Sequence, residues 1–167
     1  AIMVEGYTDV ISMHQAGVEN VVASSGTSLT TEQIRLLGRF TRNITVIYDG
    51  DLAGIHASLR GIDMILREGM NVRVVLLPPE DDPDSFARTH TAAEVQEYIR
   101  ANEEDFLTFK AKLLLKDAAG DPIKKAALIN DMVQSIVQIP DPIQRSVYIK
   151  ECARIMDIDE NLLIAEV

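Results

Sequence analysis

Four short apolar runs, separated by stretches with helical periodicity, are the feature that most constrains the fold of this chain. The runs cover residues 1–4, 21–23, 44–48 and 71–77. Continuous apolar runs of this length, rich in Val and Ile, are typical of strands buried on both faces of a parallel sheet. Strands that alternate with helices are joined by right-handed crossovers. The sequence therefore predicts an α/β fold with an open parallel sheet and flanking helices.

Helices are expected between these runs, each with a recognisable start or stop signal. Residues 8–15 are expected to form a short helix that stops at Gly17, and residues 30–40 one that opens with a threonine cap. A third, over residues 52–68, carries apolar side chains at helical spacing and ends at Gly69.

The strand signal disappears after the segment EDDPDSF (residues 80–86). From residue 92 onward the whole chain is expected to be helical, with breaks at two Asp-Pro steps. We therefore expect an α/β domain over residues 1–102 and an all-helical subdomain over residues 103–167, with a boundary near Glu103.

The chain is acidic, with a formal net charge of −10 at pH 7. Proteins that bind polyanions usually carry a basic excess, so cations or another segment must help if the substrate is a nucleotide or nucleic acid. No basic stripe interleaved with aromatic residues is evident, and we expect weak binding of single-stranded DNA.

The single cysteine, Cys152, excludes an intrachain disulfide and a cysteine-built zinc site, and suits a reducing cytoplasm. No apolar run approaches the ~20 residues of a membrane span, and the start AIMVEG does not resemble a signal peptide. Because the first residue already belongs to a strand, we expect the chain to be a piece of a longer protein.

Carboxylates follow three of the four predicted strands. In open α/β sheets the ligand crevice lies at the carboxyl ends of the strands, so these side chains are expected to converge there. Clustered carboxylates repel one another, and a hard divalent cation removes that cost. The pattern therefore indicates Mg²⁺ and a polyphosphate substrate. The carboxylates are Glu5 and Asp9, Asp49 and Asp51, and Asp82 and Asp84.

Each carboxylate also has an ordinary structural explanation. Glu5 alone reads as a solvated loop residue, and turns favour Asp and Gly for conformational reasons. Asp82 or Asp84 can cap the helix that follows, and this role is compatible with metal binding. The spacing of Asp49-Gly50-Asp51 is more specific, because glycine lets the backbone approach closely while both carboxylates face one way.

Four motifs in this order and spacing resemble the Toprim domain shared by primases and topoisomerases, most closely that of bacterial DNA primases. They are EGYTDV, the Gly26-Thr27 turn in ASSGTSLT, YDGDLAGIHASLR and EDDPDSF. The helical remainder, including IPDPIQRSVYIKECARIMDIDENLL, is similar to the helical subdomain that ends the primase RNA polymerase core.

The resemblance implies roles for individual residues. Gly26 and Thr27 shape the crevice, and Asp82 and Asp84 bind the nucleotide through metal. Whether Glu5 is a metal ligand or a general base stays open. The implied catalytic residues are Glu5, Asp9, Asp49 and Asp51, and the implied metal ligands are Glu5, Asp49, Asp51, Asp82 and Asp84.

The implied activity is synthesis of RNA primers from nucleoside triphosphates on a single-stranded DNA template, by nucleotidyl transfer that depends on Mg²⁺ or Mn²⁺. The implied setting is the bacterial cytoplasm, associated with the nucleoid. A zinc-binding domain, a basic subdomain and a domain that docks on the replicative helicase are expected only outside these residues. Without them, we expect the isolated fragment to be inactive.

Several alternatives remain. The resemblance alone leaves open a Toprim module of a topoisomerase, a nuclease or a recombination mediator. A dehalogenase-type phosphatase would place the DxD motif after its first strand, and a receiver domain would need a lysine after its last. Arg35, Arg39 and Arg42 either form a solvated face or contact template or nucleotide.

Overall fold

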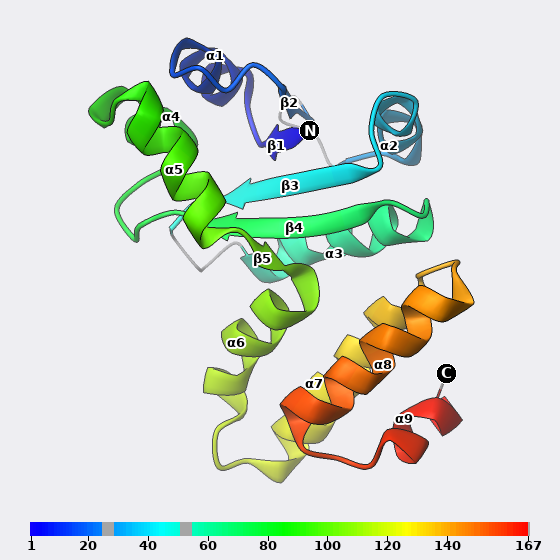
Figure 1. Ribbon diagram of the computed structural model, residues 1–167. Coiled ribbons are helices and arrows are strands. Elements are labelled where there is room, and N and C mark those ends of the chain that lie inside the picture. Colours follow the sequence, from blue (N-terminus) through cyan, green and yellow to red (C-terminus); the bar gives the residue numbers. More distant parts are fainter. Residues whose placement is uncertain (25–28, 51–54, 167) are drawn as a thin grey trace.

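The computed structural model describes residues 1–24, 29–50 and 55–166. Within these residues a five-stranded sheet carries helices on both faces (Figure 1). The strand order is β2-β1-β3-β4-β5, and the first four strands are parallel, as the sequence predicts. The strands are β1 (Ile2–Val4), β2 (Val21–Ala23), β3 (Asn43–Tyr48), β4 (Asn71–Leu76) and β5 (Glu104–Asp105).

The short strand β5 was not predicted from the sequence. It pairs antiparallel with β4, with Arg73 opposite Asp105 and Val74 opposite Glu104. Two acidic residues give no strand signal, because β propensity favours branched and aromatic side chains. The strand forms because the chain passes the exposed edge of β4 on its way from α5 to α6.

The helices within the described residues begin and end close to the predicted positions. Three of them, α4, α7 and α8, start at an Asp-Pro step in which the aspartate accepts backbone N–H groups and the proline occupies the first turn. The helices are α1 (Tyr7–Gln15), α2 (Thr31–Gly38), α3 (Ile55–Arg67), α4 (Pro83–Thr89), α5 (Ala92–Asn102), α6 (Phe106–Ala118), α7 (Pro122–Val137), α8 (Pro142–Met156) and α9 (Glu160–Glu166).

The two faces of the sheet bury two separate apolar clusters. Because successive side chains of a strand point to opposite faces, Ile47 and Val75 join one cluster while Val46 and Val74 join the other. The first cluster is closed by α1, α4 and α5 through residues such as Phe86. The second is closed by α2 and α3 and extends into α6–α9.

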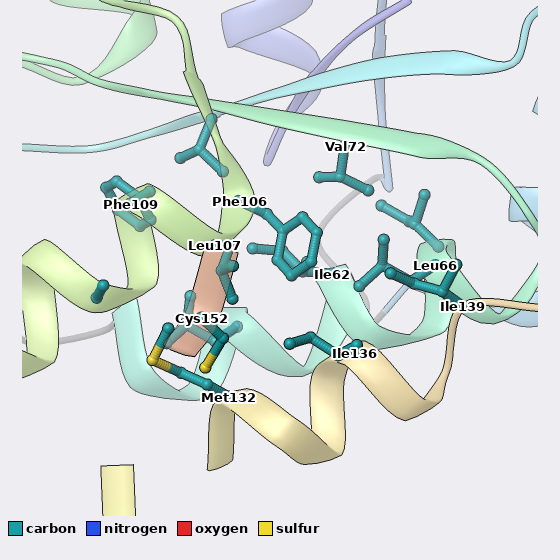
Figure 2. Close-up of a cluster of buried hydrophobic side chains, with 14 of the residues drawn as sticks. Ile62, Leu66, Val72, Phe106, Leu107, Phe109, Met132, Ile136, Ile139 and Cys152 are labelled. Carbon is teal, nitrogen blue, oxygen red and sulfur yellow. The ribbon is translucent and has the colours of Figure 1, made fainter. Parts of the chain in front are cut away.

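The helical region shares its core with the sheet. Figure 2 shows Phe106 of α6 among Ile62 and Leu66 of α3, Val72 of β4 and Ile136 of α7. Phe106 is fully buried, and all these residues belong to one cluster. The apolar core therefore runs across the predicted boundary near residue 103, and so does the sheet, because β5 (Glu104–Asp105) pairs with β4.

Candidate functional site

The loops after β3 and β4 lie against each other at the carboxyl edge of the sheet. The N–H of Gly50 donates to the carbonyl of Asp81 at 3.0 Å. A Cβ atom at position 50 would lie 1.8 Å from the carbonyl oxygen of Pro78, so only glycine fits. The glycine of the DxD motif thus lets its turn contact the acidic loop, as its spacing suggested.

Asp9 connects the segment after β1 with the segment after β4. It lies in the first turn of α1, and its two carboxylate oxygens accept the N–H groups of Gly6 and Asp84, both at 3.2 Å. Burial raises the pKa of Asp9 above its usual value, and the carboxylates of Asp82 and Asp84 raise it further, against the lowering effect of the two N–H donors. Asp9 therefore sits in an anionic environment.

Asp84 is held from two helices. Its carboxylate accepts the hydroxyl of Ser12 in α1, and Arg88, one turn further along α4, lies 3.4 Å from its other oxygen. The hydrogen bond from Ser12 lowers the pKa of Asp84, with a smaller contribution from Arg88. Asp84 therefore remains ionised at neutral pH with a fixed orientation.

Asp82 is the N-cap of α4, as the sequence allowed. Its side chain accepts the N–H of Ser85 at 2.8 Å, and the Ser85 hydroxyl donates to Asp81 at 2.8 Å. One oxygen of Asp82 is thus engaged in capping, while the residue as a whole is exposed. Capping leaves further acceptor positions on a carboxylate, so it does not exclude a ligand role.

Glu5 and Asp49 follow neighbouring parallel strands. Glu5 comes directly after β1 and is exposed, and Asp49 comes directly after β3 and is half-buried. Burial raises the pKa of Tyr48, and the negative charge of Glu5 raises it further. Since an electrostatic effect of this kind requires proximity, Glu5 lies close to the end of β3. The ring of Tyr48 stacks on the ring of Phe109 in α6, with ring centroids 6.0 Å apart.

The predicted site residues are thus distributed as follows. Asp9, Asp82 and Asp84 come together through α1 and α4, while Glu5 lies by the end of β3, where Asp49 begins the next loop. Asp51, Gly26 and Thr27 lie outside the described residues. Among the described residues alone, no three acidic, histidine or cysteine side chains are grouped closely enough to hold a metal ion.

The chemistry of the donor set fits a hard divalent cation. The predicted donors are all carboxylate oxygens, the ligands that Mg²⁺ prefers, and in the sequence they follow three strands. Burial is the main cause of the raised pKa of Asp9, so this shift reports on packing and not on a bound cation.

Sequence reasoning missed the serines that organise this edge. Ser12 and Ser85 each donate a hydroxyl to an acidic residue of the last cluster. Ser85 could have been identified from the sequence, because it is the third residue after a capping aspartate. Ser12 had no such signal, since it lies 72 positions before its partner.

Comparison with known proteins agrees with this architecture. A family model described as Toprim-like matches residues 2–87, which contain β1 to β4 and most of α4. The chain belongs to the Toprim-like family. A second family model, described as the DnaB-helicase binding domain of primase, matches residues 109–161.

Relatives of this Toprim-like chain are DNA primases. It is 35% identical over 155 residues to the DNA primase of Clostridium acetobutylicum, covering 90% of this chain and 25% of that protein. A DNA primase domain from Pseudomonas aeruginosa superposes with a TM-score of 0.83 at 28% identity, over 97% of this chain and 52% of that one. A structure of the Aquifex aeolicus primase that contains the zinc-binding and RNA polymerase domains superposes with a TM-score of 0.80 at 29% identity. The match covers 100% of this chain and 40% of that one. The chain spans about a quarter of the length of its curated relative.

The match over residues 109–161 corrects one expectation. A domain that binds the helicase was expected only outside these residues, yet a model of such a domain matches the helical region. Helical periodicity indicates apolar faces but does not distinguish one helical subdomain from another.

Within the described residues, none of the helices combines the length and apolarity that a membrane span requires.

Proposed function

We propose that this chain carries the nucleotidyl-transfer centre of a bacterial DNA primase, which synthesises RNA primers from nucleoside triphosphates on single-stranded DNA. The observation that carries the proposal is the meeting of three acidic segments at the carboxyl edge, held together by Asp9 and Gly50. The similarity to DNA primases over 90% of the chain selects primer synthesis over topoisomerase, nuclease or mediator functions.

The acidic residues are assigned to two ions. Glu5, Asp49 and Asp51 would hold a catalytic Mg²⁺ or Mn²⁺. Asp82 and Asp84 would hold a second ion with the triphosphate. The ions supply charge neutralisation for the attacking and leaving oxygens in phosphoryl transfer. Because Ser12 and Arg88 fix the Asp84 carboxylate, it would hold a cation with little reorganisation, and such a cation would stabilise negative charge that develops in the transition state.

Asp9 has a different role in this arrangement. Because its oxygens already accept the N–H groups of Gly6 and Asp84, it fixes the start of α4 against the segment that carries Glu5. We therefore assign Asp9 to positioning rather than to direct contact with the reacting groups.

The proposed partners follow from the same reading. They are nucleoside triphosphates, a template strand and the RNA primer in the bacterial cytoplasm at the nucleoid. A zinc site is proposed only for a separate domain, because the described residues offer no group suited to zinc and Cys152 is the sole cysteine. The Aquifex aeolicus primase has such a domain beside its RNA polymerase domain.

The test is primer synthesis on a single-stranded template by the protein that carries these residues. Asp49→Asn should lower the rate by about 10²–10³-fold, because a charge that holds the cation opposite the transferring phosphate is lost. Glu97→Gln, on an exposed carboxylate of α5, is the matched control and should keep the full rate. Equal rates for wild type and Asp49→Asn would refute the proposal.

Metal binding gives a readout that does not require activity. Mg²⁺ at about ten times its Kd should stabilise the folded chain by about 1.4 kcal/mol, which raises Tm by several degrees. Asp49→Asn should remove most of this shift and Glu97→Gln none of it. Identical shifts in wild type and the Asp49→Asn variant would place the metal elsewhere.

A second proposed function concerns the helical region. Residues on α7–α9 expose apolar side chains, and residues 109–161 match the helicase-binding family model. We propose that this surface contacts a replicative helicase. Ile143 and Val147 lie one turn apart on α8 and are 77% and 62% exposed. The double variant Ile143→Asp with Val147→Asp should abolish co-sedimentation with a DnaB-type helicase, whereas Ile11→Asp on α1 should not. Retained binding by the double variant would exclude this surface.

A further inference from the structure

The end of α2 and the turn that follows it present three arginines and an aromatic ring to solvent. Arg35, Arg39 and Arg42 are exposed, and the ring of Phe40 is 82% exposed between the last two. We call these four residues, together with Leu36, the α2 surface. No Asp or Glu occurs between residues 33 and 48, although the chain carries a net charge of −10.

Helix stability explains only part of this arrangement. Arg35 lies in the last turn of α2, where a cation complements the helix dipole, and it pairs with Glu68 at 3.3 Å. Neither effect explains why the apolar side chain of Phe40, which lies beyond the end of α2, is exposed. Leu36, in the same segment, is also 55% exposed. Exposed apolar side chains flanked by cations indicate a binding surface.

The backbone under Phe40 is well ordered by hydrogen bonds. The N–H of Phe40 donates to the carbonyl of Leu37 at 2.9 Å, and the N–H of Thr41 donates to the same carbonyl at 3.1 Å. The Thr41 hydroxyl accepts the N–H of Asn43 at 3.0 Å. The ring is thus displayed on a fixed turn, which reduces the entropy lost when a ligand binds.

The α2 surface lies at the opposite edge of the sheet from the acidic site. Figure 1 shows α2 at the tail of the β3 arrow, while the acidic residues follow its head. The six residues of β3 separate the two edges by about 20 Å, at ~3.3 Å per residue. A nucleic-acid strand touching both would span roughly six nucleotides at ~3.4 Å each.

We propose that the α2 surface binds single-stranded nucleic acid, with the arginines contacting phosphates and a base stacked on Phe40. Basic side chains that follow the backbone, combined with an exposed ring for stacking, are the recurring chemistry of sequence-tolerant single-strand binding. This inference rests on the proposed function for its biological purpose, because it supplies a second contact for template or product. Its physical basis is independent of the acidic site.

The α2 surface also revises an expectation from the sequence. The segment Arg39-Phe40-Thr41-Arg42 is a short basic stripe that includes an aromatic residue. Residues 30–40 were expected to form a helix, and a local pattern does not show whether its last residue, Phe40, is buried or exposed. Affinity is still expected to be weak, about 10⁻⁴–10⁻⁶ M, given the overall negative charge.

The first test measures binding of a labelled thymidine oligonucleotide of about 20 residues by fluorescence anisotropy. The double variant Arg39→Gln, Arg42→Gln should weaken binding. It should also lower the slope of log Kd against log salt concentration by about 1.4, because each of the two lost phosphate contacts contributes ~0.7. Arg100→Gln with Arg154→Gln makes the same charge change on exposed arginines of α5 and α8. This control should keep the wild-type slope, and an equal loss in both double variants would overturn the proposal.

The second test reports contact with the ring directly, because the chain contains no Trp. Phe40→Trp introduces the sole tryptophan, which can be excited selectively over the four tyrosines, and its emission should be quenched when the thymidine oligonucleotide binds. Phe40→Ala should weaken binding about tenfold without changing the salt slope, since stacking is not ionic. Binding without quenching, or unchanged affinity in Phe40→Ala, would exclude stacking at this position.

Two further measurements separate the possible explanations. The Arg39→Gln, Arg42→Gln variant should keep the Mg²⁺-induced rise in Tm, so loss of strand binding and failure of the acidic site can be told apart. Sedimentation equilibrium tests whether a second, acidic copy of the chain occupies the α2 surface instead. If the Arg39→Gln, Arg42→Gln variant changes the oligomeric state and not strand binding, the surface is a protein interface and the proposal is wrong.

Discussion

The two edges of the sheet differ in charge and in how tightly their loops pack. At the carboxyl edge, loops from separate strands contact one another through Gly50 and Asp9, and carboxylates accumulate. At the amino edge, Arg39, Phe40 and Arg42 project from one short turn and are exposed. The carboxyl edge is thus a site assembled by tertiary contacts, whereas the amino edge is a surface defined by one local segment. Mutations should therefore affect stability strongly at the first edge and weakly at the second.

Paired phenylalanine substitutions should give the largest difference. Phe86 of α4 is 2% exposed and stacks on His90 with ring centroids 4.1 Å apart, whereas Phe40 is 82% exposed. Phe86→Ala should cost about 3–5 kcal/mol of unfolding free energy, because a large cavity is created in the helix that follows the acidic loop. Phe40→Ala should change it by less than about 0.5 kcal/mol. Urea unfolding measures both, and similar costs would contradict the distinction between the edges.

Paired glycine substitutions should give the next largest difference. Gly50→Ala would place Cβ 1.8 Å from the Pro78 carbonyl oxygen, so backbone must move, and we expect a cost of about 3 kcal/mol or more. A Cβ at Gly69, between α3 and β4 at the amino edge, would meet nothing within 4 Å, but the backbone there has a φ of +79°. Gly69→Ala should cost only about 1–2 kcal/mol, from the left-handed backbone alone. Thermal or urea unfolding of the two variants tests this order.

The smallest expected effect concerns the hydroxyl of Ser12. The hydrogen bond from Ser12 lowers the pKa of Asp84 in the folded state below its value in the unfolded state. The bond therefore stabilises the fold at pH values above the unfolded-state pKa. This stability is lost as the pH falls through the folded-state pKa. Ser12→Ala should therefore lower Tm slightly at neutral pH, and the gap to wild type should close in acid. Gln15→Ala, on an exposed and uncharged residue of the same helix, is the control, and its difference in Tm from wild type should not change with pH. A gap that is constant with pH in Ser12→Ala would mean that Ser12 acts through packing.

The sequence was a good guide where a local pattern determines the outcome. The apolar runs located β1 to β4, and two Asp-Pro steps located the breaks before α7 and α8. A helix cap was predicted at Asp82 or Asp84, and Asp82 is the cap. These features depend on residues close together in the chain, so periodicity and capping preferences contain the necessary information.

The sequence was a poor guide where distant segments meet. Ser12 and Asp84 are 72 positions apart, and β5 forms only because the chain passes the edge of β4. The assignment of the helical region also required comparison with known proteins, since its helices carry no local mark of a helicase-binding domain. The ligand roles of Glu5, Asp49, Asp51, Asp82 and Asp84 stay predictions.

The sequence by itself determined the order of β1 to β4 and of the helices between them, and the positions of the carboxylates that follow these strands. Apolar runs and the chemistry of caps act over a few residues, so they can be read directly. Only the tertiary structure decided that Asp9 braces the start of α4, that Gly50 must be glycine and that Phe40 faces solvent. Each of these depends on which distant atoms lie within a few ångströms, and close packing of separate segments sets that distance.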